Sequence, residues 1–586
     1  ISEPYRTTNS IHTSPAHLQE MSSQHSSADP NEKWPRNNNH DTDSIAETVS
    51  SVDTQADQDA LGRALTAHAS RTSHMSLSER VTTIPTNATS DPNFEVDWDS
   101  EDDPANPKNW SMAYTAMGII FLSWNTLVVV LYSTSYTSAT AQIEEEFAQS
   151  ETVVTLGLTF YLIGLAIGSM FMAPLSEVYG RKPVCVTCML VFTAMIIPAA
   201  LAKSITTLIV VRFIGALFGS VMISTAPGMV ADMVDDEHRA LAISIWSIGP
   251  LNGPVVGPVI GGFVTQYLGW RWMCWIVLIL SGVGLCFALI LKEPYGPTLL
   301  QKKAARLRKE TGDSRWWSRY DRKDSLYEIL KLALSRPFVM AVTEPICIFW
   351  DIYVAIVYGI LYLCFVAYPI VFQEIRGWSL GLSGLSFVGI GIGVVLTIGS
   401  EPLVRRLINK HEKDPETGKV YPEAMVSFIC ICSVLIPIGE LWFAWTCAPA
   451  SIHWVVPLLA GIPFGAGNTG VFIYASNYLT GSYGMYAASA LAGNSVIRSI
   501  LGGVLPLAGT AMYNSLGPNW AGTLLGLLEV LIIPIPFVFY KYGHKIRQKS
   551  TMIMRMQEEK KKLEGKRARR VAQLAAVAEE EKPEEV

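Results

Sequence analysis

Long apolar segments separated by shorter polar ones fill most of the chain between residues 112 and 540. About twelve of these segments approach or exceed the ~20 residues that a helix needs to cross the ~30 Å hydrocarbon core of a bilayer. They lie at 112–132, 152–173, 183–202, 205–228, 240–268, 272–291, 338–371, 380–399, 424–446, 452–478, 484–508 and 520–540. This pattern predicts an all-α polytopic membrane protein with about twelve transmembrane helices.

Polar stretches divide the chain into tails, bundles and a central link. The first hundred residues are rich in Ser, Thr, Asn, Asp and His and cannot bury enough apolar surface to fold alone. A long polar link separates the sixth apolar segment from the seventh. The predicted order is a disordered tail at 1–105, a six-helix bundle at 106–291, a loop at 292–337, a second six-helix bundle at 338–540 and a tail at 541–586.

The basic residues predict which side of the bundle faces the cytoplasm, because Lys and Arg concentrate in short cytoplasmic loops. The connections on one side contain Arg181, Lys182, Lys302, Lys303, Arg306, Arg308, Lys309, Arg405, Arg406, Lys541, Lys545 and Arg547. The opposite connections contain only Lys203, Arg271 and Arg376. Both termini and the central loop are therefore expected in the cytoplasm.

The overall composition narrows the class of protein and its partners. The 586 residues are 49% hydrophobic and 16% charged, which is too apolar for a water-soluble globule of this size. Topology accounts for the basic residues and the net charge is −6, so the lipid bilayer is an expected partner and nucleic acid is not. Cys185 and Cys188 form a CxxC on an apolar helix without a second pair or a histidine nearby, so no metal site is expected.

The fifth apolar segment carries an unusual glycine and proline pattern. Gly249, Gly253, Gly257 and Gly261 recur every four residues, and the first three are followed by Pro250, Pro254 and Pro258. Glycines at helical spacing form a groove that another backbone can approach closely, and each proline removes a backbone donor. This segment is therefore predicted to be a spanning helix that bends and packs tightly.

A short turn after the second segment carries a charged motif. The stretch GSMFMAPLSEVYGRKP contains Gly168, Pro174, Glu177, Gly180, Arg181 and Lys182. In the second half, Gly399-Ser400-Glu401-Pro402-Leu403 followed by Arg405 and Arg406 looks like a degraded copy. Such a repeat is expected of a transporter that is built from two related halves.

These motifs together resemble the major facilitator superfamily over roughly 104–548. The charged turn resembles its loop signature, with Glu177 in place of the usual aspartate, and Arg212 in LIVVRFIGALFG resembles the fourth-helix motif of proton-coupled members. The 249–262 stretch resembles the fifth-helix antiporter motif, although Trp246 stands where a glycine is expected. The closest resemblance is to the fungal twelve-helix drug:proton antiporters.

The resemblance implies two six-helix bundles around a central cavity that opens alternately to either side. It implies export of drugs, fungicides, toxins or secondary metabolites coupled to proton entry, with the proton gradient as energy source and no cofactor. Small amphipathic or cationic compounds and protons are the expected partners. We expect a monomer in the plasma membrane, with the vacuolar membrane as an alternative.

Ionisable residues inside a bilayer are costly, so each is a functional candidate. Arg212, Asp351, Glu440 and Glu529 are the candidates for proton coupling. For the three acids, the alternative interpretation is snorkelling toward the interface or an internal pair with Arg498.

The seventh segment places Asp351, Val354, Tyr358, Tyr362 and Phe365 on one helix face. An acid beside tyrosine rings would suit an amphipathic cation, whereas ordinary packing is the alternative. The candidates for lining the cavity are Asn125, Trp246, Asn252, Tyr358, Tyr362, Asn468, Asn494 and Arg498.

Other functions remain open at the level of the sequence. The acidic stretch Asp232-Met233-Val234-Asp235-Asp236-Glu237-His238 has the spacing of magnesium–diphosphate sites, but the second acidic cluster that such sites need is not found. A cluster that caps the fifth helix is favoured instead. The sequence contains no common hydrolase or ATP-binding motif, so an enzyme is not expected. A nutrient or polyamine carrier of the same fold is the other alternative.

Overall fold

The computed structural model describes residues 94–100, 102–235, 238–321, 326–413, 415, 420–558 and 561. The predicted tails before residue 94 and after residue 561 lie outside the described residues, as do Asp236 and Glu237 of the acidic stretch. Within the described part, the regular secondary structure is helical, apart from isolated bridges between Glu95 and Trp317 and between Lys413 and Val420.

The first half contains six spans, as predicted. After the short η4 (Pro107–Asn109), its helices are α4 (Met112–Ser135) continued by η5 (Tyr136–Ala139) and α5 (Thr140–Phe147), α6 (Glu151–Tyr179), α7 (Arg181–Ala200), the broken span α8 (Ile205–Gly219), α9 (Val221–Ser224) and α10 (Ala226–Met233), α11 (Arg239–Leu268) and α12 (Trp270–Ile290). The breaks in the fourth span fall at Ser220 and Thr225.

The second half follows the same plan. Its helices are α15 (Pro345–Pro369) continued by the π-helical η6 (Ile370–Ile375), α16 (Leu380–Leu385), α17 (Val388–Gly399), α18 (Glu401–Asn409), α19 (Glu423–Thr446), α20 (Val455–Tyr483), η7 (Gly484–Tyr486), α21 (Ala487–Ile532) and α22 (Pro534–Gln548). In the described residues, 11 helices are long and apolar enough to span a membrane. The last of these, Ala487–Gln548, turns sharply at Gly517, whose φ of 74° favours glycine, so it accounts for two of the twelve predicted spans.

The central link and the seventh span differ from the expected loop and the expected 338–371 helix. The link contains two helices, α13 (Gly296–Thr311) and α14 (Leu326–Thr343). The chain then breaks at Glu344, which has an extended conformation, before α15 begins at Pro345. A residue that precedes proline is disfavoured in the α region, so the expected single helix divides at this point.

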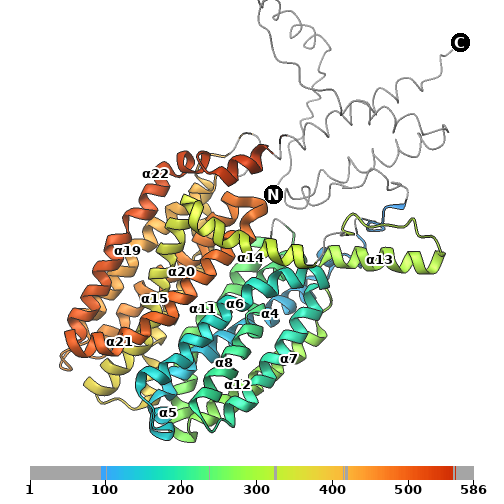
Figure 1. Ribbon diagram of the computed structural model, residues 1–586. Helices are drawn as coiled ribbons and strands as arrows, with labels where there is room; N and C mark the ends of the chain where they lie inside the picture. The colour runs from blue at the N-terminus through green and yellow to red at the C-terminus, as the bar shows by residue number, and fades with distance from the viewer. Residues whose placement is uncertain are drawn as a thin grey trace, which may run out of the picture. The chain divides into compact units, whose positions relative to one another are not determined.

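The two halves stand side by side, with the helices of the first half in blue to green and those of the second in yellow to red (Figure 1). The halves meet where α11 packs against α16 and α17, and where α6 packs against α21. We call the end of the bundle that carries Gly180 and Glu344 the inner end. The opposite end, which carries Gly269 and Gly517, is the outer end. The distribution of basic residues predicts that the inner end faces the cytoplasm.

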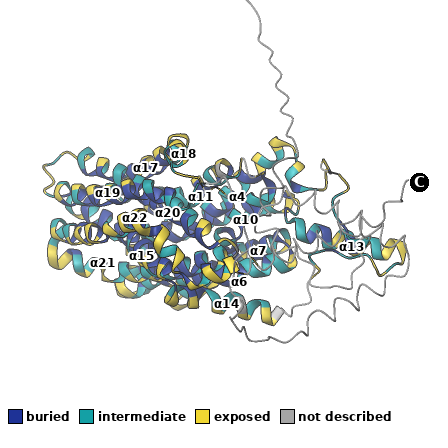
Figure 2. Ribbon diagram, turned by 90° about the horizontal axis from the view of Figure 1, so that it is seen from above, coloured by how far each residue is buried: buried dark blue, intermediate teal, exposed yellow. Residues whose placement is uncertain are grey.

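Apolar side chains occupy both the interior and the outside of the bundle. Buried residues concentrate along the helix interfaces, whereas exposed positions lie on the outward faces (Figure 2). Many of the exposed side chains are large and apolar, such as Val342, Leu524 and Leu531. An outer surface of this kind suits contact with lipid tails rather than with water.

Part of the expected N-terminal tail has a defined place. The amide of Val96 donates to the Trp317 carbonyl at 2.9 Å. Arg319 pairs with Glu95 at 2.9 Å and with Asp97 at 2.5 Å. All of residues 1–105 were expected to be disordered. Residues 95–97 are ordered instead, because their acidic side chains pair with Arg319 of the central link.

Candidate functional site

A carboxylate from a distant part of the chain holds the turn between α6 and α7. Gly180 adopts φ 101° and ψ 151°, a conformation that favours glycine, so α6 ends at Tyr179 and α7 begins at Arg181. The amides of Arg181 and Lys182 donate to the two carboxylate oxygens of Glu293 at 3.0 and 3.1 Å. These amides are unsatisfied donors at a helix start, where the helix dipole also favours a negative charge.

The side chain of Arg181 joins three helices of the first half. Its Nε donates to Asp232 Oδ2 on α10 at 3.2 Å, and its Nη1 donates to Ser176 Oγ on α6 at 2.9 Å. Its Nη2 lies 4.0 Å from Glu177 Oε1. The charged motif of the sequence is therefore an assembled cluster, and it ties α6, α7 and α10 together at the inner end.

The interpretation of the acidic stretch as a helix cap is wrong for Asp232. This residue lies inside α10 and pairs with Arg181, because a buried guanidinium requires a counter-charge. The fifth span begins at Arg239, and its N-cap residue His238 makes no side-chain capping hydrogen bond. Among the described residues, no group of three or more His, Cys, Asp or Glu side chains is placed to hold a metal ion.

The glycine face of α11 packs directly on α4. Methyl groups built at Gly249 and Gly257 would overlap the Ser123 carbonyl and the Thr134 hydroxyl. A methyl group at Gly253 would lie 2.8 Å from Val130, and one at Gly261 would lie 2.7 Å from the Ser135 carbonyl. The predicted close backbone approach is confirmed, and the partner helix belongs to the same half of the protein.

A second glycine pattern lets α11 contact the other half. A methyl group at Gly384 would overlap the Pro258 carbonyl, and one at Gly391 would lie 2.9 Å from Val255. Near the outer end, a methyl group at Gly262 would lie 2.8 Å from the Leu380 carbonyl. The sequence analysis missed these glycines of α16 and α17, although their spacing in the eighth apolar segment is also helical. They let α11 pack closely against α16 and α17.

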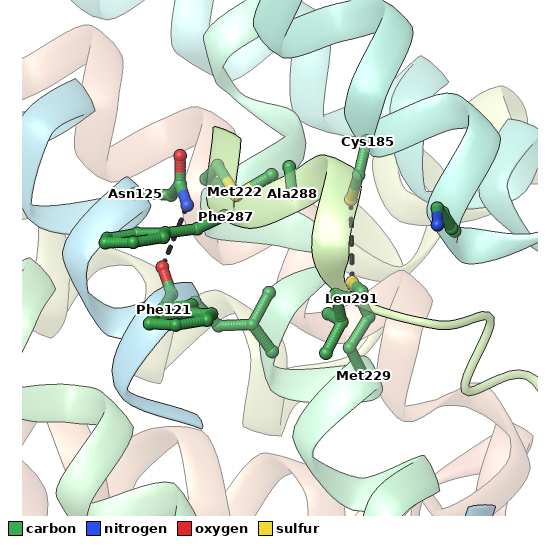
Figure 3. Close-up of a pocket in the computed structure, with 10 residues that line it drawn as sticks. Phe121, Asn125, Cys185, Met222, Met229, Phe287, Ala288 and Leu291 are labelled. Carbon is green, nitrogen blue, oxygen red and sulfur yellow. Dashed lines mark hydrogen bonds between the residues drawn. The ribbon is translucent and has the colours of Figure 1, made fainter. Parts of the chain in front are cut away.

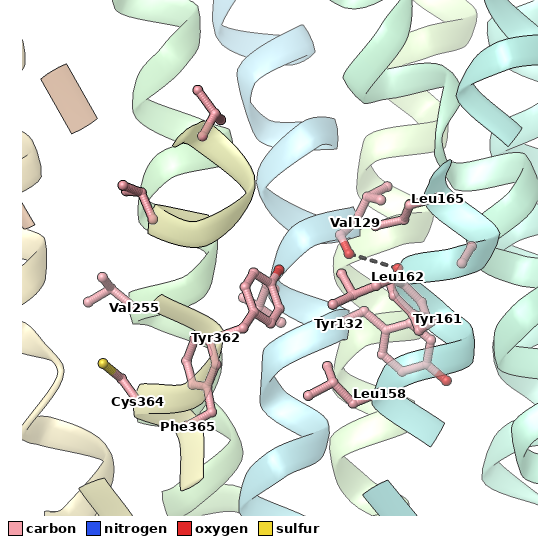
Figure 4. Packing of buried hydrophobic residues seen from close by; sticks show 14 of the residues in the cluster. Val129, Tyr132, Leu158, Tyr161, Leu162, Leu165, Val255, Tyr362, Cys364 and Phe365 are labelled. Atoms are coloured by element: carbon pink, nitrogen blue, oxygen red, sulfur yellow. Dashed lines mark hydrogen bonds between the residues drawn. The ribbon is translucent and has the colours of Figure 1, made fainter. Parts of the chain in front are cut away.

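Arg212 lies in a cage of three tyrosine rings. The guanidinium carbon is 4.5, 4.2 and 4.9 Å from the ring centroids of Tyr132, Tyr136 and Tyr161. Its Nε and Nη2 donate to the carbonyls of Gly157 and Tyr132, each at 3.2 Å. Its Nη1 is buried without a hydrogen-bond partner among the described residues. Figure 4 shows Tyr132 and Tyr161 in this core, with the Tyr161 hydroxyl donating to the Val129 carbonyl at 2.7 Å.

Asp351 pairs with an amide rather than with an arginine. Its Oδ1 accepts a hydrogen bond of 2.9 Å from Asn494 Nδ2, and the side chain is buried. Its Oδ2 is buried without a partner among the described residues. The alternative interpretation, an internal pair with Arg498, does not hold for Asp351 because Asn494 occupies this position on α21.

Glu440 on α19 and Glu529 on α21 are buried electrostatic neighbours within the second half. In the described part of the chain, neither carboxylate oxygen of Glu529 has a hydrogen-bond partner. A methyl group at Gly522 would lie 3.6 Å from Glu440 Oε1. Both acids lie inside the second half, where they also interact with Cys364 on α15, and neither lines the cavity between the halves.

A cavity lies between the two halves, with an empty volume of about 770 Å³ that includes the solvent at its opening. Its walls are mainly apolar, as is usual for small-molecule sites. Three of the predicted residues line it, namely Tyr358, Asn468 and Arg498. The other lining residues are Val130, Ile223, Pro250, Leu251, Pro254, Val255, Val354, Val357, Leu361, Ile390, Val394, Gly465, Thr469, Val471 and Phe472.

The other predicted lining residues lie outside this wall. Asn125 donates to the Phe121 and Gly284 carbonyls at 2.8 and 3.2 Å and borders a smaller pocket in the first half (Figure 3). Trp246 is buried and donates to the Thr126 hydroxyl at 3.2 Å. The side-chain donors of both residues are bonded within their own half, whereas Asn125 Oδ1 is buried without a partner among the described residues.

Tyr362, Asn252 and Asn494 are also outside the described wall of the cavity. Tyr362 is buried, and its hydroxyl lies 3.3 Å from that of Tyr358. Asn252 donates to the carbonyl of Ile248 on its own helix at 2.9 Å, and Asn494 holds Asp351. Five residues of the seventh span were predicted to share one helix face. Of these, only Val354 and Tyr358 line the cavity.

The comparisons with known proteins agree with this architecture. The family model of the Major Facilitator Superfamily matches residues 113–502. The chain is 40% identical over 78% of its length to the multidrug transporter mdrA of Aspergillus fumigatus, covering 75% of that protein. It is 41% identical over 76% of its length to the efflux pump MFS2 of Trichophyton rubrum, also covering 75% of that protein.

A solved structure shows the same fold at low sequence identity. The proton:xylose symporter XylE aligns with 74% of this chain and 96% of its own, with a TM-score of 0.54 and 14% identity. That likeness concerns the fold alone. Because the family model covers more than half of the chain and relatives share about 40% identity over most of it, the protein belongs to the major facilitator superfamily.

Proposed function

We propose that the protein exports small amphipathic compounds by alternating access, driven by proton entry. The observation that carries this proposal is the central cavity, which helices of both halves line. Rocking of one bundle against the other can expose such a site to either side of the membrane in turn. The printed names of the fungal relatives, a multidrug transporter and an efflux pump, support export as the direction.

We further propose Asp351 as the proton carrier. It lies one helical turn from Val354, which lines the cavity, and its partner Asn494 lies one turn from Arg498, which also lines it. A buried carboxyl group with one free oxygen can take up and release a proton as the cavity changes its access. Glu440 and Glu529 do not line the cavity, and in this proposal they have a structural role.

We propose that Arg212 contributes to the coupling of proton entry to export by holding α4, α6 and α8 in place. Its tyrosine cage joins α4, α6 and α8, and the Ser133 hydroxyl on α4 lies 3.3 Å from the Tyr362 hydroxyl on α15. This contact between the halves provides a path from the arginine cage to the seventh span. A substitution at Arg212 should therefore change the transition between states rather than substrate affinity.

The remaining parts of the proposal concern place and assembly. We propose a monomer in the plasma membrane with the inner end in the cytoplasm, and the vacuolar membrane is the alternative location. A nutrient or polyamine carrier of the same fold is the alternative function. Export against a gradient separates the two, because a facilitator only equalises concentrations.

The test uses an efflux-deficient yeast that expresses the full chain. Cells are loaded separately with a fluorescent organic anion and a fluorescent lipophilic cation, and retention is followed with and without a protonophore. The proposal predicts that expression lowers retention of at least one probe and that the protonophore abolishes the difference. Unchanged retention of both probes, or loss that the protonophore does not affect, would contradict proton-driven export.

A further inference from the structure

The described wall of the central cavity contains one charged side chain, Arg498 on α21. The neutral polar groups of the wall are few, and among them Asn468 donates to the Phe464 carbonyl of its own helix at 2.9 Å. The acid that the sequence placed beside the tyrosines, Asp351, is bonded to Asn494 and lies outside the wall. The electrostatic character of the cavity is therefore positive rather than negative.

The guanidinium of Arg498 has little compensation from the protein. Its Nη2 donates to Ser495 Oγ over 3.4 Å, and its Nε is buried without a hydrogen-bond partner among the described residues. Other arginines and lysines of the described chain form ion pairs with acids. Among these residues, Arg498 forms none. A desolvated cation without a counter-ion is costly, so an anion that enters the cavity would be bound strongly.

Two aromatic rings fix the position of the guanidinium. Its central carbon lies 4.6 Å from the centroid of Phe472 and 5.4 Å from that of Tyr358. A planar guanidinium held in this way presents donors in a fork that matches the two oxygens of a carboxylate. The apolar walls formed by Leu251 and Ile390 suit an uncharged, flat remainder of a ligand.

We infer that the central cavity selects amphipathic organic anions and that Arg498, held against the rings of Phe472 and Tyr358, binds their carboxylate or phenolate group. This inference rests on the proposal that this cavity is the transport site. It replaces the expectation of a cationic substrate, which depended on Asp351 facing the cavity. A monocation would meet the Arg498 charge in a site with no acid in its described wall, so repulsion excludes it.

The test measures equilibrium binding to the purified full-length protein in lipid nanodiscs. The probes are fluorescein methyl ester, a monoanion at neutral pH, and rhodamine 6G, a monocation with the same xanthene frame. Fluorescence anisotropy gives the Kd of each. Arg498→Gln removes the charge, Arg498→Lys keeps it without the planar fork, and Arg306→Gln makes the same change at an exposed position on α13.

The inference predicts that the wild type binds the anion at least tenfold more tightly than the cation. Arg498→Gln should weaken anion binding about tenfold or more, as expected for loss of a charge-assisted hydrogen bond. The affinity of Arg498→Lys for the anion should lie between those of the wild type and Arg498→Gln. The affinity of Arg306→Gln should match that of the wild type. Thermal unfolding of each variant shows that it is folded, and the Arg498→Lys result stands if Arg498→Gln does not fold.

Two results would overturn the inference. One is a wild type that binds rhodamine 6G as tightly as the anion or that binds neither probe. The other is a folded Arg498→Gln variant with unchanged affinity for the anion. Selective anion binding without gradient-driven flux would support the cavity chemistry and contradict the proposed export, whereas proton-driven flux of the cation alone would support export and contradict the anion site.

Discussion

Arg181 on α7 and Asp232 on α10 form an ion pair of 3.2 Å at the inner end of the first half. The arginine side chain is 10% exposed and that of Asp232 is 24% exposed. Water therefore screens this pair only in part. The pair holds the fourth span against the turn that joins the second and third spans.

We predict that Arg181→Ala cripples transport without preventing membrane insertion. The substitution leaves Asp232 without its counter-charge and removes charged hydrogen bonds worth about 2 kcal/mol. Arg405→Ala is the matched control, because Arg405 pairs with Glu401 at the corresponding turn of the second half but is 43% exposed. Flux and melting temperature, compared at equal surface expression, provide the measurement. Full flux in Arg181→Ala would refute a role of this cluster in the transport cycle.

The glycine face of α11 gives a second prediction. Gly249→Ala should destabilise the protein by about 1–3 kcal/mol, because the added methyl group meets a main-chain carbonyl that cannot move aside. Gly282→Ala on α12 is the control, since a methyl group there has nothing within 4 Å. Thermal unfolding in detergent compares the two variants. Equal melting temperatures would contradict the close packing of α11 on α4.

A third prediction concerns Glu344, which binds the start of the C-terminal helical segment at residues 551–558. Its side chain is fully buried. It accepts hydrogen bonds from the Thr551 hydroxyl at 2.9 Å and the Met552 amide at 3.1 Å, and also from the Ser550 hydroxyl. A carboxylate at this position caps the first turn of the helical residues 551–558.

We expect Glu344→Gln to release residues 551–558 from the inner end. Loss of the carboxylate should lower amide protection there about tenfold, since charge-assisted hydrogen bonds are worth more than ~1.4 kcal/mol. Hydrogen exchange followed by mass spectrometry reads this segment directly. Glu374→Gln, at an exposed position in η6, should leave the protection unchanged. If amide protection of residues 551–558 is the same in Glu344→Gln as in the wild type, Glu344 does not hold this segment.

A fourth prediction separates proton coupling from binding. Asp351→Asn keeps the size of the side chain but fixes it in an uncharged form. We expect exchange of substrate across the membrane without a gradient to continue and proton-driven accumulation to stop. Glu529→Gln is the comparison, because this acid is buried in the second half and does not line the cavity. Accumulation that survives in Asp351→Asn and stops in Glu529→Gln would reassign the carrier.

The spans and the glycine groove could be predicted because each is written in a local pattern. Apolar length predicts a crossing, and glycines every four residues predict a close approach wherever the partner lies. The division at Glu344 is also visible in the sequence, since Pro345 follows it directly, but the apolar residues on both sides of it concealed the break. Local patterns therefore carried most of the fold.

The candidate site was predicted less well because its contacts join distant segments. Glu293 holds the turn at Arg181 from 112 residues further along the chain. Helical spacing placed Asp351 and Tyr358 on one face, yet Asn494 draws the acid to α21 while the tyrosine reaches the cavity. The side of the helix that faces each neighbour depends on how the bundles pack, and periodicity alone does not contain this information.

The most direct test of proton-driven export is flux in proteoliposomes that contain the purified full-length protein. A pH gradient of either sign is imposed, and the movement of fluorescein methyl ester and of protons is followed together. The account predicts that the probe accumulates in the compartment from which protons leave, that the two fluxes are linked, and that a protonophore abolishes both. Probe movement that only equalises concentrations and ignores the pH gradient would contradict proton-coupled export.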